Sequence, residues 1–174
     1  MTIAPAPIDR IEIVTSDPRW PAAFAREAAR IRAALHAHAE PAIEHIGSTA
    51  VPGLDAKPVI DILLIEPDTA RWPGFVAPLQ GLGYVLWADN PRRDRLFFVK
   101  GMPPLGNGRT HHVHVRTPAD AQRECAFRDW LRAHADDAAR YAALKRELVT
   151  AHAGDREAYT EGKTAFIEAI LAKR

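Results

Sequence analysis

The most informative hydrophobic pattern of the chain lies between residues 42 and 65, where two apolar runs flank a short polar loop. The first run, Ala42 to Ile46, leads into Gly47-Ser48, and the second, Val59 to Ile65, contains a single charge at Asp61. Short apolar runs bounded by glycine and proline are typical of buried strands. The pattern therefore predicts a strand, a tight turn and a second strand that carries one carboxylate.

Helical periodicity precedes this region and returns in the last third of the chain. Apolar residues recur at helical spacing from Trp20 to Leu35, behind a start signal at Asp17-Pro18. Further helical patterns cover residues 121–133 and 136–151 and the segment that Asp155 can cap. The remaining predicted elements are a strand at 11–14, a helix that ends near Gly81, and strands at 84–87, 95–100 and 110–116.

This order of elements predicts one α+β domain over residues 1–174, with a mixed β-sheet flanked by helices. Residues of about 10–117 would form the α/β core, and residues 118–174 a helical tail packed on it. Residues 1–8 contain Pro5 and Pro7, which favour an extended segment.

Composition and charge narrow the class of protein. The net charge is +1, and no basic stripe appears, which argues against a nucleic-acid partner. No apolar run approaches the ~18 residues of a membrane span, and no signal-peptide pattern is present, so we expect no membrane partner. The single cysteine, Cys125, excludes an internal disulfide and makes a cytoplasmic location the expectation. No pattern specifies an oligomeric state.

The polar turn and the strand carboxylate are the first candidates for chemistry. Glycine at position 47 would let a phosphate approach the backbone, and the Ser48 hydroxyl could donate to it. A carboxylate such as Asp61 inside an apolar strand is costly unless a metal, a cation or hydrogen bonds satisfy it. Lys57 could contact a phosphate or pair with Asp61. A simple turn and a structural carboxylate are the alternatives.

A second candidate group lies on the strand predicted over residues 110–116. Period-two alternation places Val113 and Val115 on one face and His112, His114 and Arg116 on the other. If this strand neighbours the one that carries Asp61, both histidines could face the same site. Two solvated histidines on an exposed sheet face are the alternative.

These residues stand in sequences that resemble a known family. Several segments closely resemble sequences of the GrpB family. The longest are His45–Leu54 (HIGSTAVPGL) and Ala56–Ile62 (AKPVIDI). The resemblance continues at Gly83-Tyr84, Arg95–Lys100, His112–Val115, Phe127–Leu131, Tyr141–Lys145 and the pair Tyr159/Lys163. A Gly-Ser turn followed by an aspartate on a strand is also similar to the nucleotidyltransferase superfamily of polymerase-beta type. The resemblance implies a nucleotidyltransferase-like fold. Some family members are fused to dephospho-coenzyme A kinase, which indicates nucleotide-related work.

One departure from the superfamily bears on any metal site. Catalytic members carry a second carboxylate two residues after the first, and this chain has Leu63 at that position. They carry a third carboxylate on a neighbouring strand, where this chain has His112 and His114. Mg²⁺ or Mn²⁺ could still bind through Asp61 and His114, with phosphate oxygens completing the set. The histidines shift the preference toward Zn²⁺, Ni²⁺ or Mn²⁺, or toward direct phosphate contacts without a metal.

Further residues are candidates for binding a phosphorylated ligand, with ordinary packing or solvation as the alternative for each. His45 precedes the Gly-Ser turn, and Arg95 belongs to a basic turn. In the helical tail, Tyr141 and Lys145 share a helix face at i, i+4. The full set of expected binding residues is Gly47, Ser48, Thr49, Lys57, His45, Arg95, Arg128, Tyr141, Lys145 and Lys163; the expected catalytic residues are Asp61, His112 and His114.

Three hypotheses for function follow. The first is a protein that binds a nucleotide or another phosphorylated small molecule and carries out metal-assisted nucleotidyl or phosphoryl transfer. The second is a non-catalytic binding module that kept the fold after losing carboxylates, which Leu63 favours. The third is a metal-binding protein or hydrolase built on His112 and His114.

Overall fold

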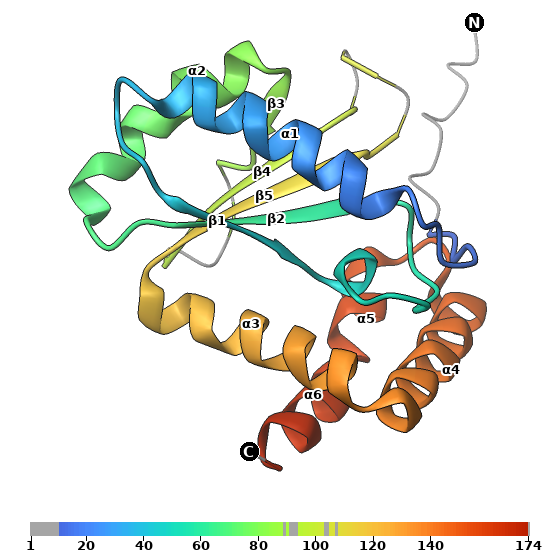
Figure 1. Ribbon diagram of the computed structural model, residues 1–174. Helices are drawn as coiled ribbons and strands as arrows, with labels where there is room; N and C mark the ends of the chain where they lie inside the picture. The colour runs from blue at the N-terminus through green and yellow to red at the C-terminus, as the bar shows by residue number, and fades with distance from the viewer. Residues whose placement is uncertain (1–10, 89, 91–93, 103–104, 107, 174) are drawn as a thin grey trace, which may run out of the picture.

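A mixed five-stranded sheet forms the centre of the protein, whose computed structural model describes residues 11–88, 90, 94–102, 105–106 and 108–173. The strand order is β1-β2-β5-β4-β3. β2 and β5 are parallel, and the other neighbouring pairs are antiparallel (Figure 1). The bounds are β1 Ala42–Ile46, β2 Ile60–Ile65, β3 Tyr84–Leu86, β4 Leu96–Lys100 and β5 His111–Arg116.

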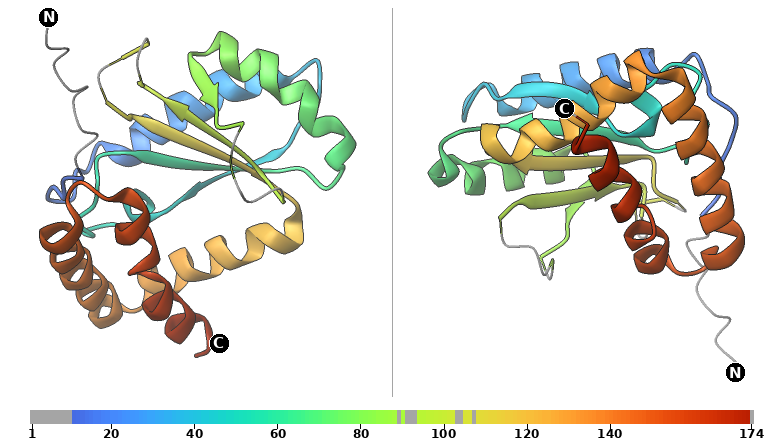
Figure 2. Two further views of the ribbon diagram at one scale, coloured as in Figure 1. Left: turned by 180° about the vertical axis from the view of Figure 1, so that it is seen from behind. Right: turned by 90° about the horizontal axis from the view of Figure 1, so that it is seen from below.

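Helices cover both faces of this sheet, as Figures 1 and 2 show. On one face lie α1 (Trp20–Leu35), the 3₁₀ helix η2 (Thr69–Phe75) and α2 (Val76–Gly81). On the other face lies α3 (Pro118–Ala133), followed on the same side by α4 (Ala135–His152), α5 (Arg156–Glu161) and α6 (Thr164–Leu171). The predicted α+β class is confirmed, with its mixed sheet, its flanking helices and its C-terminal helical segment.

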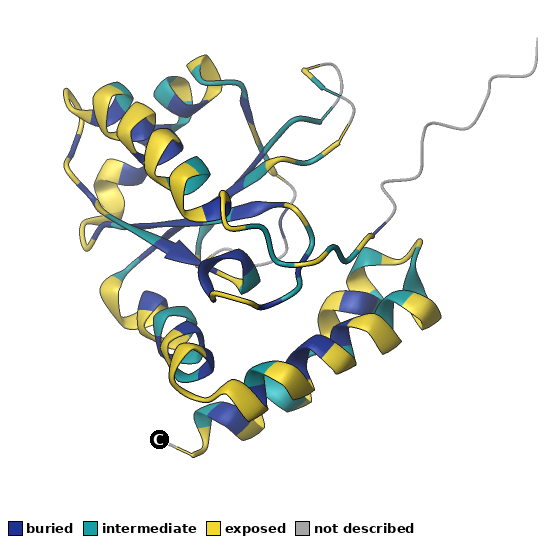
Figure 3. Ribbon diagram, turned by 45° about the vertical axis from the view of Figure 1, so that its right-hand side comes forward, coloured by how far each residue is buried: buried dark blue, intermediate teal, exposed yellow. Residues whose placement is uncertain are grey.

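The main apolar core lies between the sheet and the α1/α2 layer. Its sheet side is built from residues that alternate along the strands, which include Ile60, Ile62, Leu64, Phe98, Val113 and Val115. Buried positions concentrate on the strands, and exposed ones on the outward sides of the helices (Figure 3). Because side chains alternate across a strand, the residues between these apolar positions face the α3 side.

The helical tail packs on the loop that follows β1. Val51 and Leu54 of this loop share an apolar cluster with Leu131 of α3 and Tyr141 of α4. The loop begins with the 3₁₀ helix η1 (Ser48–Ala50). The tail therefore brings its side chains against the Gly-Ser turn.

Two predicted elements were wrong. Residues 11–14 do not form a strand, since within them only Val14 makes an isolated bridge, with Ala56. The predicted last helix is two helices, α5 and α6. The break falls at Gly162, where the chain packs closely on Leu148 of α4: a Cβ there would lie 2.4 Å from Leu148 Cδ2, so that side chain would have to shift. The extended segment predicted for residues 1–8 lies outside the described residues.

A buried carboxylate, Glu27, ties α1 to the sheet. It accepts hydrogen bonds from Tyr84 Oη at 3.1 Å and Lys100 Nζ at 2.6 Å, and Arg30 pairs with it at 3.0 Å. Burial alone would raise its pKa, but Lys100 and Tyr84 hold the net pKa below its ordinary value. Glu27 is therefore ionised at neutral pH.

We expect Glu27→Gln to lower the free energy of unfolding by about 2–3 kcal/mol, because Lys100 would keep its charge in a largely buried position without a counter-charge. Urea unfolding followed by circular dichroism measures the change. The control is Glu40→Gln at an exposed position, where we expect a change within about 0.5 kcal/mol. Equal midpoints for the two variants would contradict this role of Glu27.

Candidate functional site

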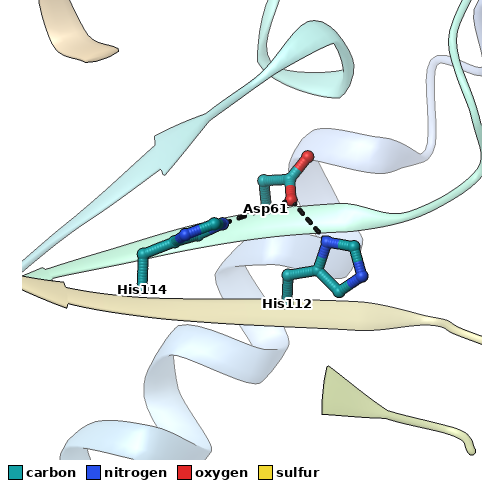
Figure 4. A group of neighbouring side chains, drawn as sticks. All are labelled: Asp61, His112 and His114. Carbon is teal, nitrogen blue, oxygen red and sulfur yellow. Dashed lines mark hydrogen bonds and ion pairs between the residues drawn. The ribbon is translucent and has the colours of Figure 1, made fainter. Parts of the chain in front are cut away.

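Three side chains from two neighbouring strands meet at the start of β2. Asp61 pairs in register with His112 of β5, and its Oδ1 lies 2.9 Å from His112 Nδ1. The same oxygen lies 3.6 Å from His114 Nε2 (Figure 4). We call Asp61, His112 and His114 the Asp-His-His group. The sequence predicted that both histidines would face the carboxylate if the strands were neighbours, and the parallel β2–β5 pairing brings them together.

Alternation along both strands explains why these three residues face the same way. Ile60 and Ile62 on either side of Asp61 are buried in the main core, and so is Val113 between the two histidines. Burying these apolar residues against α1 turns their neighbours toward α3. The hydrophobic pattern thus orients the polar group.

The Gly47 turn touches the free side of the Asp61 carboxylate. A Cβ at position 47 would lie 2.6 Å from Asp61 Oδ2, and Gly47 has φ +72° and ψ −173°. This backbone conformation is essentially restricted to glycine. Position 47 requires glycine for two reasons, its backbone angles and its closeness to the carboxylate.

Electrostatics make Asp61 an anion beside a neutral imidazole. Burial alone would raise the pKa of Asp61, but the hydrogen bonds to His112 and His114 hold it far below its ordinary value. Burial lowers the pKa of His112, against the opposing effect of Asp61. His112 is therefore neutral at pH 7, with Nδ1 directed at Asp61. Its Nε2 is buried and has no hydrogen-bond partner within the described part of the chain.

Lysines from the tail and from the loop before β2 lie near one another, and one of them, Lys145, contacts the Gly47 turn. Lys145 of α4 is buried, and its Nζ donates to Ser48 Oγ at 3.0 Å and to the carbonyl of Asp55. Burial and the charges of Lys163 and Lys57 lower the pKa of Lys145 to about 7. Burial, followed by the charge of Lys57, lowers the pKa of Lys163 to about 8. We call Lys57, Lys145 and Lys163 the lysine cluster.

Two tyrosine rings lie beside the members of the lysine cluster. Lys57 and Lys163 lie 5.2 Å and 4.5 Å from the ring centroid of Tyr159, and Lys145 lies 4.9 Å from that of Tyr141. Burial raises the pKa of Tyr159 to about 12, with a further contribution from Asp61. Both tyrosines are therefore protonated at neutral pH, and their ring faces partly stabilise the cations.

His45 and Thr49 lie apart from the Asp-His-His group. His45 pairs in register with Ile62, so its ring faces the α1 side, where it stacks on Phe24 with ring centroids 4.6 Å apart. Its Nε2 lies 3.0 Å from Thr49 Oγ1, and both side chains are buried. Burial lowers the pKa of His45 to about 4, so the ring is neutral. His45 and Thr49 therefore support the Gly47 turn from the α1 side of the sheet.

The two arginines predicted to bind the ligand, Arg128 and Arg95, also point away from the Asp-His-His group. Arg128 of α3 donates to Glu44 Oε2 at 2.7 Å and to the carbonyl of His45 at 2.9 Å, which joins the tail to β1. Arg95 pairs with Asp94 at 2.7 Å, at the end of the β4–β5 ladder opposite to His112. Neither arginine contacts the Asp-His-His group.

Leu63 occupies the position at which a second strand carboxylate would stand. It is fully buried and packs with Ile46 and with Ala121 of α3. Its neighbour in register on β5 is His114. The group therefore offers one carboxylate and two imidazoles.

Sequence reasoning missed three residues of this region. The ring centroid of Phe97 on β4 lies 5.1 Å from that of His112 and 4.8 Å from that of His114, so it forms an apolar wall against both. The ring of Tyr159 lies beside two lysines, and Asp55 supplies a carbonyl to Lys145. Alternation on β4 could have indicated Phe97. The i, i+4 spacing of Tyr159 and Lys163 could have indicated Tyr159, whereas no local pattern indicates Asp55, because Lys145 lies 90 positions away.

Comparison with known proteins gives a consistent result along the chain. A family model described as GrpB protein matches residues 10–173. The UPF0157 protein PA4798 of Pseudomonas aeruginosa is 57% identical over 165 residues, which cover 95% of this chain and 68% of that protein. The crystal structure of conserved protein GrpB from Enterococcus faecalis superimposes with a TM-score of 0.81 at 32% identity, covering 93% of this chain and 96% of that one.

A longer relative carries a similar segment. A dephospho-CoA kinase of Mycolicibacterium paratuberculosis is 34% identical over 184 residues, which cover 92% of this chain and 44% of the kinase. In the part of the chain that the structure describes, no helix is both long and apolar enough to cross a membrane.

Gly47→Ala tests the contact between the turn and Asp61. Gly53 is a matched control, because it also has a positive φ, +76°, but a Cβ there would meet nothing within 4 Å. We expect both alanine variants to lose about 1–2 kcal/mol of unfolding free energy from backbone strain. Gly47→Ala should lose about 1–3 kcal/mol more, because the new methyl group must displace the carboxylate.

Urea unfolding of the two variants side by side measures this difference. Equal destabilisation by Gly47→Ala and Gly53→Ala would show that a side chain at position 47 does not collide with the Asp61 carboxylate.

Proposed function

This chain belongs to the GrpB family, and from that premise we propose that it binds a phosphorylated small molecule of nucleotide type. The ligand lies against Ser48 and the lysine cluster, beside Asp61. The observation that carries the proposal is the contact of Lys145 Nζ with Ser48 Oγ at 3.0 Å, with Lys163 and Lys57 near enough for their charges to lower the pKa of Lys145. Like charges in a buried place are costly, and a bound polyanion removes that cost.

The residues around the lysine cluster suit phosphate recognition. Ser48 Oγ accepts from Lys145 Nζ at 3.0 Å, which leaves its own proton available to a phosphate oxygen. Gly47 has no side chain to shield the backbone of the turn. Lysine ammonium groups bind phosphate as point charges, and the tyrosine rings beside them limit where they can move.

Transfer chemistry is the further step of this proposal. The expected Mg²⁺ or Mn²⁺ would bind at Asp61 and His114, but one carboxylate and two imidazoles do not fit the oxygen ligands that Mg²⁺ prefers. We therefore assign no step to Mg²⁺. The chain's own contribution is to neutralise phosphate charge with lysines and to orient an acceptor hydroxyl with the Asp61 carboxylate.

A non-catalytic binding module is the second candidate. The observation that favours it is the buried Leu63, which packs under α3 where a second carboxylate would be needed. This candidate predicts ligand binding without metal dependence and without turnover. The name of the longer relative, dephospho-CoA kinase, supports including coenzyme A precursors among the ligands tested.

Calorimetric titration with ATP, GTP, CTP and dephospho-coenzyme A tests the proposal. We expect one of them to bind, and the double variant Lys145→Met/Lys163→Met to weaken that binding at least about 100-fold, because each charged hydrogen bond contributes about 1.5–3 kcal/mol. Asp61→Ala should change the affinity as well. Lys173→Met is the control, because Lys173 pairs with Asp137 outside the cluster.

The proposal fails if none of these ligands binds, or if the double variant and the Lys173→Met control bind equally well. Release of pyrophosphate or orthophosphate in the same samples separates transfer from simple binding.

The affinity for the bound nucleotide should fall as the pH rises from 7.5 to 9.5. A polyanion favours the charged lysines, whose pKa values without ligand are about 7 for Lys145 and about 8 for Lys163. Above these values binding must take up protons, so each lysine contributes at most about a tenfold loss per pH unit. Lys145→Met should flatten the pH profile; a profile that is flat for the unmodified protein would count against a role of these lysines.

A further inference from the structure

The ligand atoms of the Asp-His-His group are spaced like those of a metal site. Asp61 Oδ1 lies 2.9 Å from His112 Nδ1 and 3.6 Å from His114 Nε2, and one ligand atom of each residue lies within 4.8 Å of the other two. Tetrahedral ligands about 2.0–2.1 Å from a zinc ion are about 3.3 Å apart. The two measured distances bracket this value.

His112 is the most buried member of the group, and its Nδ1 is the nitrogen directed at Asp61. The residue is 8% exposed, and its Nε2 has no hydrogen-bond partner among the described residues. The hydrogen bond from Nδ1 to Asp61 requires a proton on Nδ1, so a metal ion bound at this nitrogen would replace that proton, and the imidazole would keep its other proton on Nε2.

The residues around the Asp-His-His group determine which ligand atoms a metal ion would meet. Leu63 is packed in an apolar cluster under α3, so β2 contributes one carboxylate, and Phe97 stands against both imidazole rings. A set of two imidazole nitrogens and one carboxylate oxygen suits zinc, iron and nickel, whereas Mg²⁺ prefers oxygen alone. We propose that the Asp-His-His group binds one divalent transition-metal ion of the imidazole-preferring kind, with Zn²⁺ as the best match.

Three protein ligands leave coordination positions for another molecule, as in catalytic zinc sites. Asp61 Oδ1 faces the histidines and Oδ2 faces the Gly47 turn, beyond which Ser48 meets Lys145. The metal site therefore adjoins the place proposed for the phosphorylated ligand, and a phosphate oxygen or a water is the chemical class that suits the remaining positions. The metal inference rests on the three ligands alone, so it does not depend on the proposed function.

Titration of chelator-treated full-length protein with Zn²⁺, in competition with a chromophoric chelator, measures affinity and stoichiometry. We expect one strong site per chain. Co²⁺ in place of Zn²⁺ should give the visible absorption bands of a low-coordinate site. A large excess of Mg²⁺ should not displace the Co²⁺ bands.

Variants assign the site to these residues. His114→Gln and Asp61→Asn should each weaken Zn²⁺ binding at least about 100-fold, since removing even a supporting residue of a metal site costs 10–100-fold. His114 is only half-buried, so its variant is expected to fold, and circular dichroism checks this. His111→Ala is the matched control, because His111 lies on the same strand and faces the opposite side, and its Zn²⁺ affinity should be unchanged.

Absence of stoichiometric Zn²⁺ or Co²⁺ binding would overturn the inference, and so would equal affinity in His114→Gln and His111→Ala, or displacement of Co²⁺ by Mg²⁺. Nucleotide titrations in the presence of EDTA keep the two proposals separate. Nucleotide binding without any Zn²⁺ site would refute the metal inference alone, and a Zn²⁺ site without nucleotide binding would refute the proposed function alone.

Discussion

The contact between the Asp61 carboxylate and the two histidines of β5 is the constraint on which the site depends. A carboxylate in an otherwise apolar strand must be compensated, and here the compensation comes from the neighbouring strand at 2.9 Å and 3.6 Å. This contact is made only if β2 and β5 pair in parallel and in this register. A shift of either strand by one residue would turn its own polar side chains into the main core, Asp61 in the case of β2 and both histidines in the case of β5.

The surroundings of this contact divide into two charge environments. On the β5 side, the histidines and Phe97 form a partly apolar wall suited to a metal ion with nitrogen ligands. On the side of the Gly47 turn, the tail brings in Lys145 and Lys163, which suit a polyanion. One carboxylate lies between the two environments and would influence ligands bound in either.

The helical tail creates the positively charged environment beside the Gly47 turn. Arg128 bonds β1, and Tyr141 packs on the loop after η1, which places α4 where its lysine reaches Ser48. Without this packing, the lysines would be ordinary solvated cations on a helix surface. Their lowered pKa values are therefore a property of the docked tail and of the burial that docking imposes.

Alternation and helical periodicity were sufficient to predict the five strands, the long helices and the one-sided placement of His112 and His114, because these patterns depend on near neighbours in the chain. They failed at residues 11–14 and at the break between α5 and α6, where pairing or packing with distant segments decides the structure.

For the candidate site, the sequence by itself determined which residue types were available: one strand carboxylate, two histidines, a glycine turn and several cations. Only the tertiary structure decided which of them meet. It brought Lys145 to Ser48 and the histidines to Asp61, turned His45 and Arg128 to structural contacts, and placed the ring of Tyr159 beside Lys57 as well as Lys163. The physical reason is that the contacts which assemble the site join residues far apart in sequence: Lys145 and Ser48 are separated by 97 positions, and His112 and Asp61 by 51. Burial of the apolar faces, not local spacing, sets where these side chains point.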